Sequence, residues 1–134
     1  MLHSIAKCGT TEETKLDIFD CRAISSAHAN RFHGGGYENV DHYTNCELIF
    51  LDIGNIHAVS TCFNKMVEIS SKPENFNSIN KYGPKVEESG YMQMISGILI
   101  GANKMVNSML VKKRNVIVHC SDGWDRTSQI STLT

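Results

Sequence analysis

Residues 115–127, which read NVIVHCSDGWDRT, decide the fold of this chain. The first five, NVIVH, form a short apolar run with the length and the β-branched content of a buried strand. That strand leads directly into the loop CSDGWDRT, and the SQISTLT that follows starts like a helix. A buried strand that delivers a loop to the start of a helix is typical of α/β proteins with a parallel sheet.

Upstream of this stretch, the sequence predicts alternating strands and helices. Residues 15–20 (KLDIFD) alternate apolar and polar side chains, and residues 47–53 (ELIFLDI) are nearly continuously apolar, so both are predicted as strands. The predicted helices span residues 23–32, 56–69 and 87–111. The glycines at 34–36 end the first helix, and Pro, Asn, Ser and Gly predict a loop over 71–84. This order predicts an α/β fold with a mostly parallel sheet flanked by helices.

The apolar residues of the two longer helices recur at three- and four-residue steps, which predicts that they face a core. In the helix 56–69 they are Ile56, Val59, Phe63, Met66, Val67 and Ile69. In the helix 87–111 they are Tyr91, Met92, Ile95, Ile98, Leu99, Ala102, Met105, Val106, Met109 and Leu110. The basic run at 112–114 suits the C-terminal dipole of this second helix.

The composition excludes several classes of protein. With 134 residues, 41% of them hydrophobic and 20% charged, the chain is neither collagen-like nor broadly disordered, and it has the size of at most one domain. A net charge of −1 gives no electrostatic footprint for nucleic acid, so no nucleic-acid partner is expected. No apolar run approaches the roughly 20 residues of a membrane span. The first residues also lack the pattern of a signal peptide, so we expect a soluble or peripheral protein.

The chain contains five cysteines, spread widely and without a C-x-x-C pair. An odd number of separated cysteines predicts reduced thiols in the cytosol rather than a disulfide framework. The cysteines and histidines form no cluster with zinc-ligand spacing, so neither a metal nor another cofactor is expected. Four cysteines are interpreted as small core hydrophobes or as partly exposed residues without a role: Cys8, Cys21, Cys46 and Cys62.

Cys120 differs from the others because Arg126 follows it after five residues, between a buried strand and the start of a helix. Thiol-based phosphoryl transfer requires this arrangement. Backbone N–H groups that curl into a helix start bind an anion, and with the guanidinium they lower the pKa of Cys120. Arg126 can also hold two phosphate oxygens in its planar fork.

Other residues of the loop supply the remaining groups that this chemistry needs. Asp122 and Asp125 are candidates for the acid that protonates the leaving alkoxide. Thr127 is a candidate hydrogen-bond donor to the sulfur as it leaves a phosphocysteine intermediate. The alternative interpretation is a structural strand–turn–helix with a buried cysteine and surface acids.

Residues 119–127, HCSDGWDRT, resemble the signature loop of the myotubularin phosphoinositide 3-phosphatases. Other segments resemble the same family and follow its order: DCR at 20–22, ANR at 29–31, GGGYE at 34–38, NCE at 45–47, LDIGNIH at 51–57 and ESG at 88–90. The resemblance covers residues 16–134, which is nearly the whole chain.

The resemblance implies a fold like that of the protein tyrosine phosphatases and removal of the 3-phosphate from phosphatidylinositol 3-phosphate and phosphatidylinositol 3,5-bisphosphate. It implies Cys120 as the nucleophile, Arg126 as the phosphate clamp and Asp125 as the general acid. The implied substrate-binding residues are Asn30, Asn55, Ile56, Ser121, Asp122, Gly123, Trp124, Asp125 and Arg126. It also implies peripheral contact with endosomal membranes from the cytoplasm, and it leaves open a homo- or hetero-oligomer with other family members.

Other interpretations stand beside this one. Protein tyrosine and dual-specificity phosphatases share the C-x5-R chemistry. Only about two helical turns follow Arg126, so residues 1–134 are predicted to be a partial phosphatase domain, truncated after its phosphate-binding loop. A third interpretation is that such a fragment acts without catalysis, as an interaction module. From pattern alone, Asn30 and Asn55 are equally interpreted as cap or turn residues.

Overall fold

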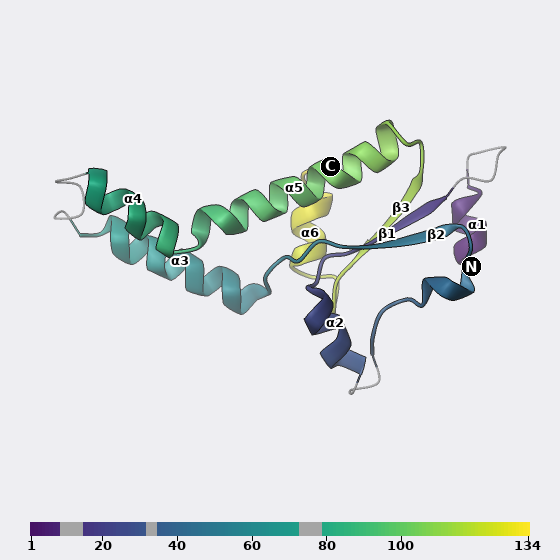
Figure 1. Cartoon of the computed structure of the whole chain (residues 1–134), viewed down its shortest axis with the longest axis horizontal. Coiled ribbons are helices and arrows are strands. Elements are labelled where there is room, and N and C mark those ends of the chain that lie inside the picture. Colours follow the sequence, from purple (N-terminus) through teal and green to yellow (C-terminus); the bar gives the residue numbers. More distant parts are fainter. Residues whose placement is uncertain (9–14, 32–34, 73–78) are drawn as a thin grey trace.

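The computed structural model describes residues 1–8, 15–31, 35–72 and 79–134 (Figure 1). Within them one parallel sheet has the strand order β2-β1-β3, with β1 at Leu16–Asp20, β2 at Cys46–Phe50 and β3 at Asn115–His119. The central strand pairs along its whole length with both neighbours. The predicted parallel α/β architecture is therefore confirmed, with β2 ending three residues before the expected boundary at residue 53.

Helices cover both faces of this sheet. The short helix α1 (Leu2–Ala6) packs on one face, where Leu16 and Ile18 of β1 form a cluster with Ala6. On the opposite face, α5 (Tyr91–Leu110) and α6 (Arg126–Ser131) enclose a second cluster that contains Phe19 and Cys21. Because side chains alternate along a strand, β1 contributes to both clusters, and all five of its residues are buried.

The buried carboxylate of Asp17 links β1 to α5 and to Arg114. Asp17, which is fully buried, accepts a hydrogen bond from the Ser108 hydroxyl of α5 at 2.7 Å. Its other carboxylate oxygen lies 2.8 Å from Arg114, which also pairs with Glu47 of β2 at 2.6 Å. The expectation that Arg114 serves the dipole of the preceding helix is thus wrong, because the nearby strands offer it two carboxylates.

A helical arm extends from the sheet (Figure 1). It consists of α3 (Ile56–Ser70), α4 (Ile79–Glu88) and the first part of α5, which then runs back over the sheet. The short helices α2 (Ile24–Arg31) and η1 (Val40–His42) lie between β1 and β2 in the chain. Both α2 and α3 confirm predicted helices, and the predicted break at Gly34 lies outside the described residues.

The predicted single helix over 87–111 is wrong, because the structure has two helices there. A turn at Ser89 and Gly90 separates α4 from α5. Gly90 adopts a left-handed conformation, with φ 74°, which glycine reaches without steric cost. The Ser89 hydroxyl accepts the N–H of Tyr91 at 3.2 Å and donates to the carbonyl of Val86 at 2.6 Å. These two side-chain hydrogen bonds satisfy backbone groups at the turn between α4 and α5.

The predicted loop over 71–84 is wrong for residues 79–84, which form the first part of α4, while residues 73–78 lie outside the described part. Gly83 and Pro84 predict a loop because glycine and proline usually end helices. Pro84 is instead accommodated within α4, at the cost of one backbone hydrogen-bond donor.

Several apolar side chains that were predicted to face a core are exposed. They are Ile56, Phe63 and Val67 of α3 and Met92, Leu99 and Leu110 of α5, each with between 46% and 63% of its surface accessible. The reason is geometric, because α3 lies beyond the sheet and packs mainly on α4 and α5. None of the described helices is both long enough and apolar enough to cross a membrane.

Candidate active site

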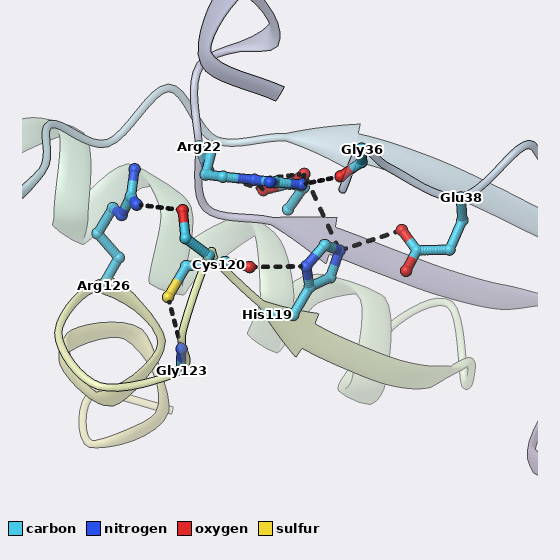
Figure 2. Close-up of polar contacts among 9 residues, drawn as sticks. Arg22, Gly36, Glu38, His119, Cys120, Gly123 and Arg126 are labelled. Carbon is cyan, nitrogen blue, oxygen red and sulfur yellow. Dashed lines mark hydrogen bonds and ion pairs between the residues drawn. The ribbon is translucent and has the colours of Figure 1, made fainter. Parts of the chain in front are cut away.

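Strand β3 delivers Cys120 to the edge of the sheet, and α6 begins six residues later at Arg126. The Cys120 side chain is 9% exposed, at the base of the loop 121–125. The backbone N–H of Gly123 donates to its sulfur at 3.1 Å (Figure 2). Gly123 has φ 80°, a conformation that suits glycine and turns this N–H back toward the sulfur. The predicted strand, loop and helix start are confirmed here.

The surroundings of Cys120 favour its thiolate form. Burial by itself raises the pKa of a thiol, because the charged form loses solvation. Hydrogen bonds from the Thr127 side chain and backbone, and from the backbone of Gly123 and Asp122, outweigh this and lower the pKa of Cys120 from 9.0 to about 7. The Thr127 hydroxyl is buried, and it interacts with the sulfurs of both Cys120 and Cys21.

The Arg126 guanidinium lies over the same loop, where it donates to the Ser121 hydroxyl at 3.1 Å (Figure 2). A cleft of about 240 Å³ opens between this loop and the start of α3. Its lining residues are Asn55, Ile56, His57, Cys120, Ser121, Asp122, Trp124, Asp125 and Arg126. A thiolate, a guanidinium and a carboxylate thus share one cleft, which is the set that phosphoryl transfer to sulfur needs.

A second cleft, of about 300 Å³, lies on the other side of Cys120. Its lining residues are Arg22, Asn30, Gly35, Gly36, Glu38, His119, Cys120, Ser121 and Asp122. Asn30 therefore lines a different cleft from Asn55 and Ile56, and the two clefts adjoin at the loop. The two clefts have only Cys120, Ser121 and Asp122 in common.

A buried ion pair supports the second cleft. The Arg22 guanidinium, only 4% exposed, binds both carboxylate oxygens of Asp20 and donates to the carbonyl of Gly36 at 2.7 Å. Asp20 itself is fully buried. The fork of Arg22 therefore ties the end of β1 to the segment that leads toward β2, and so shapes the wall of the cleft.

His119 lies between this ion pair and the loop. Its Nε2 is 3.2 Å from Oε2 of Glu38 and 4.0 Å from Oδ2 of Asp20, while its Nδ1 is 3.2 Å from the carbonyl oxygen of Cys120 (Figure 2). The ring therefore lies between two carboxylates on one side and the backbone of the loop on the other. Figure 2 shows Arg126 and Gly123 on one side of Cys120 and His119 with Glu38 on the other.

The structure brings most of the predicted site residues together. Of the predicted set, Asn55 also serves as the N-cap of α3, accepting the N–H of Ala58 at 3.0 Å, so its cap interpretation is also correct. Gly123 contributes its backbone rather than lining a cleft. Within the described residues, no group of three or more metal-ligating side chains is arranged to hold an ion.

Sequence reasoning missed six residues that line the clefts: Arg22, Gly35, Gly36, Glu38, His57 and His119. Two of them are the histidines His57 and His119. Their positions in the sequence could have indicated them, because His57 follows Ile56 and His119 precedes Cys120, and both neighbours belong to the predicted site. No local pattern shows that Arg22 is buried against a carboxylate.

Together these features define a class of protein. A parallel sheet that presents a low-pKa cysteine in a loop of backbone donors, with an arginine at the start of the following helix, is the mark of an α/β phosphatase-like domain. The chain belongs to the myotubularin family, because the family model described as the myotubularin-like phosphatase domain matches residues 1–134.

Individual relatives agree with this membership. The chain is 38% identical over 131 residues to myotubularin of Xenopus laevis, covering 91% of this chain and 20% of that protein. It is 41% identical over 129 residues to phosphatidylinositol-3,5-bisphosphate 3-phosphatase MTMR2 of Gallus gallus, covering 90% and 20%. It is 35% identical over 133 residues to phosphatidylinositol-3,5-bisphosphate 3-phosphatase MTMR6 of Homo sapiens, covering 99% and 21%. The chain therefore spans about a fifth of the length of these relatives.

Proposed function

We propose that this chain carries the reaction centre of a cysteine-dependent phosphoinositide 3-phosphatase. The expected substrates are phosphatidylinositol 3-phosphate and phosphatidylinositol 3,5-bisphosphate. The observation that carries the proposal is that the Cys120 sulfur, held by the N–H of Gly123 and with its pKa lowered to about 7, shares a cleft with Arg126 and Asp125. The names of two relatives, which describe phosphatidylinositol-3,5-bisphosphate 3-phosphatases, support the substrate class.

The proposed reaction has two steps. In the first, the Cys120 thiolate attacks phosphorus, an S–P bond forms, and the P–O bond to the inositol ring breaks while Asp125 protonates the leaving oxygen. Arg126 holds two oxygens of the phosphoryl group as charge develops on them. In the second step, water attacks phosphorus and gives a proton to the Asp125 carboxylate, a P–O bond forms, the S–P bond breaks, and Thr127 donates to the sulfur as it leaves as a thiolate.

The rim of the cleft fits contact with a lipid headgroup. Asn55 and Ile56 lie at the start of α3, next to the phosphate-binding loop, and would face the inositol ring. Trp124 is 81% exposed and would reach toward the lipid surface. Asn30 would contact a substituent that enters the second cleft through the shared residues Ser121 and Asp122.

The proposal has consequences for location and partners. A phosphatase that acts on a membrane lipid must meet the bilayer, and we propose peripheral contact with endosomal membranes from the cytoplasm. We also propose that residues 1–134 form part of a larger catalytic domain, which the exposed apolar side chains of α3 and α5 support. An oligomer with other family members stays a prediction from the resemblance.

The test measures phosphate release from vesicles that contain each lipid, with full-length protein that carries this chain. Cys120→Ser is expected to abolish release, because serine is not a thiolate at neutral pH, while Cys62→Ser on α3 serves as the matched control. Release that persists in Cys120→Ser disproves the nucleophile assignment. Faster turnover of phosphotyrosine peptides than of the lipids would favour the protein tyrosine phosphatase alternative.

Asp125 is tested separately through the leaving group. Asp125→Asn is expected to slow the first step strongly for the inositol lipid and weakly for an aryl phosphate, whose leaving oxygen needs no proton. Asp122→Asn is the matched control, because Asp122 lines the same cleft. An equal loss with both substrates in Asp125→Asn would contradict the acid role.

A further inference from the structure

Cys21 lies directly beside Cys120, although the two are far apart in the sequence. Strands β1 and β3 pair in parallel up to Asp20 and His119. The N–H of Cys21 then donates to the carbonyl of His119 at 2.8 Å, so the pairing continues by one residue. Neighbouring strands are about 4.8 Å apart, and disulfides join residues whose Cα atoms are about 4.4–6.8 Å apart. The backbone spacing therefore permits a bond between these two cysteines.

The two side chains also point the same way. Cys21 follows Phe19 by two residues and Cys120 follows Val118 by two residues, so both extend the face of the sheet that α5 and α6 cover. Both belong to one core cluster, and the Thr127 hydroxyl interacts with both sulfurs. None of the other three cysteines belongs to this cluster as the described residues define it.

Access differs sharply between the two thiols. Cys120 lines both clefts, which open to solvent, whereas Cys21 is 0% exposed. Burial raises the pKa of Cys21 to about 12, and the neighbouring Cys120 and Asp20 add to this effect. Cys21 is therefore a neutral thiol that no dissolved reagent reaches, and Cys120 is the thiolate that meets such a reagent first.

We propose that Cys21 is a resolving cysteine, which forms a reversible disulfide with Cys120 after a hydroperoxide oxidises Cys120. In the first step the Cys120 thiolate attacks an oxygen of the hydroperoxide. An S–O bond forms, the O–O bond breaks, and the departing alkoxide or hydroxide takes a proton from water. Cys120 becomes a sulfenic acid, oxidised by two electrons, and the peroxide is reduced by the same two.

In the second step the Cys21 sulfur attacks the Cys120 sulfur. The S–S bond forms, the S–O bond breaks, and the hydroxide leaves as water with the proton of the Cys21 thiol. The disulfide removes the nucleophile from the cleft and blocks further oxidation of Cys120 to sulfinic and sulfonic acids. A dithiol reductant restores both thiols. This modification does not depend on the proposed phosphatase activity, because it needs only the two thiols and the peroxide.

Peptide mapping tests the proposal on the full-length protein. Folded protein is treated with hydrogen peroxide, its free thiols are blocked, and the unreduced digest is analysed by mass spectrometry. We expect a peptide pair that joins Cys21 to Cys120 as the main linked species, and its loss after dithiothreitol. Protein treated in urea should lose this preference, because an unfolded chain rarely brings together two residues so far apart.

A pair of variants sharpens the test. In Cys21→Ala, hydrogen peroxide is expected to carry Cys120 to sulfinic and sulfonic acids, and dithiothreitol should no longer restore its alkylation by iodoacetamide. Cys62→Ala is the matched control and should recover as the wild type does. Oxidised Cys120 in the folded wild type without a link to Cys21 would overturn the proposal, and so would full recovery in Cys21→Ala. Peptide mapping of the wild-type protein tests for the disulfide between Cys21 and Cys120 even if the Cys21→Ala protein does not fold.

Discussion

The hydroxyl of Thr127 is predicted to hold the Cys120 thiolate. It is the first of the interactions that lower the pKa of Cys120 to about 7, and it also interacts with the neighbouring sulfur of Cys21. Thr127→Val removes this donor and leaves the shape of the side chain nearly unchanged. A hydrogen bond to a charged group contributes about 1.5–3 kcal/mol, and one pKa unit corresponds to about 1.4 kcal/mol. The pKa of Cys120 should therefore rise by about one unit or more in this variant.

The assay follows alkylation of Cys120 by iodoacetamide as a function of pH, with the modified peptide quantified by mass spectrometry. Only the thiolate reacts, so the rate rises with pH and levels off above the pKa. In the wild type the midpoint should lie near pH 7, because the pKa of Cys120 is about 7 rather than the ordinary 9.0. In Thr127→Val the whole curve should move toward higher pH. The midpoint reports the pKa without depending on how nucleophilic the sulfur is.

Ser128→Ala is the matched control, because Ser128 lies on the same turn of α6 but donates to the carbonyl of Trp124 instead. Its midpoint should equal that of the wild type. A wild-type midpoint near pH 9 would refute the reasoning that the loop outweighs burial. A Thr127→Val midpoint identical to the wild type would show that the backbone donors act alone.

Three further variants test what holds the fold, each measured by urea unfolding. Arg22→Ala leaves the buried Asp20 carboxylate without its fork and should cost about 3–5 kcal/mol. Ser108→Ala leaves one oxygen of the buried Asp17 carboxylate without its donor and should cost about 1–3 kcal/mol. Gly90→Ala forces a side chain into the left-handed region at φ 74° and should cost about 1–2 kcal/mol.

Two control variants lie on the same helix α5. Gly97 has no atom within 4 Å of the position a Cβ would take, so Gly97→Ala should raise the free energy of unfolding by about 0.5–1 kcal/mol. Ser96 is exposed, and Ser96→Ala should change it by less than about 0.5 kcal/mol. If Ser108→Ala and Ser96→Ala lowered the free energy of unfolding equally, the stabilising role of the hydrogen bond from Ser108 to the buried Asp17 carboxylate would be contradicted. A Gly90→Ala protein as stable as the wild type would contradict the account of the turn.

Much of the sheet and of the site could be predicted because their signals are local. The strand at 16–20 alternates apolar and polar side chains and the strand at 115–119 is a short apolar run, and the loop carries its donors, its nucleophile and its arginine within nine residues. The helical arm was predicted less well. Its apolar spacing correctly indicated helices, but such spacing does not show which elements will cover an apolar face. Phe63 and Leu99 are exposed for that reason.

The spacing of residues 119–127 was sufficient to indicate the proposed chemistry, since it places a thiol, backbone donors and a guanidinium close together in one loop. The neighbours of that loop depend on long-range pairing. Only the register of β1 against β3 places Cys21 beside Cys120, and only the folded chain brings Asn30 and Arg22 to one cleft beside His119. Residues far apart in the chain become neighbours through strand pairing and packing, which no local pattern records.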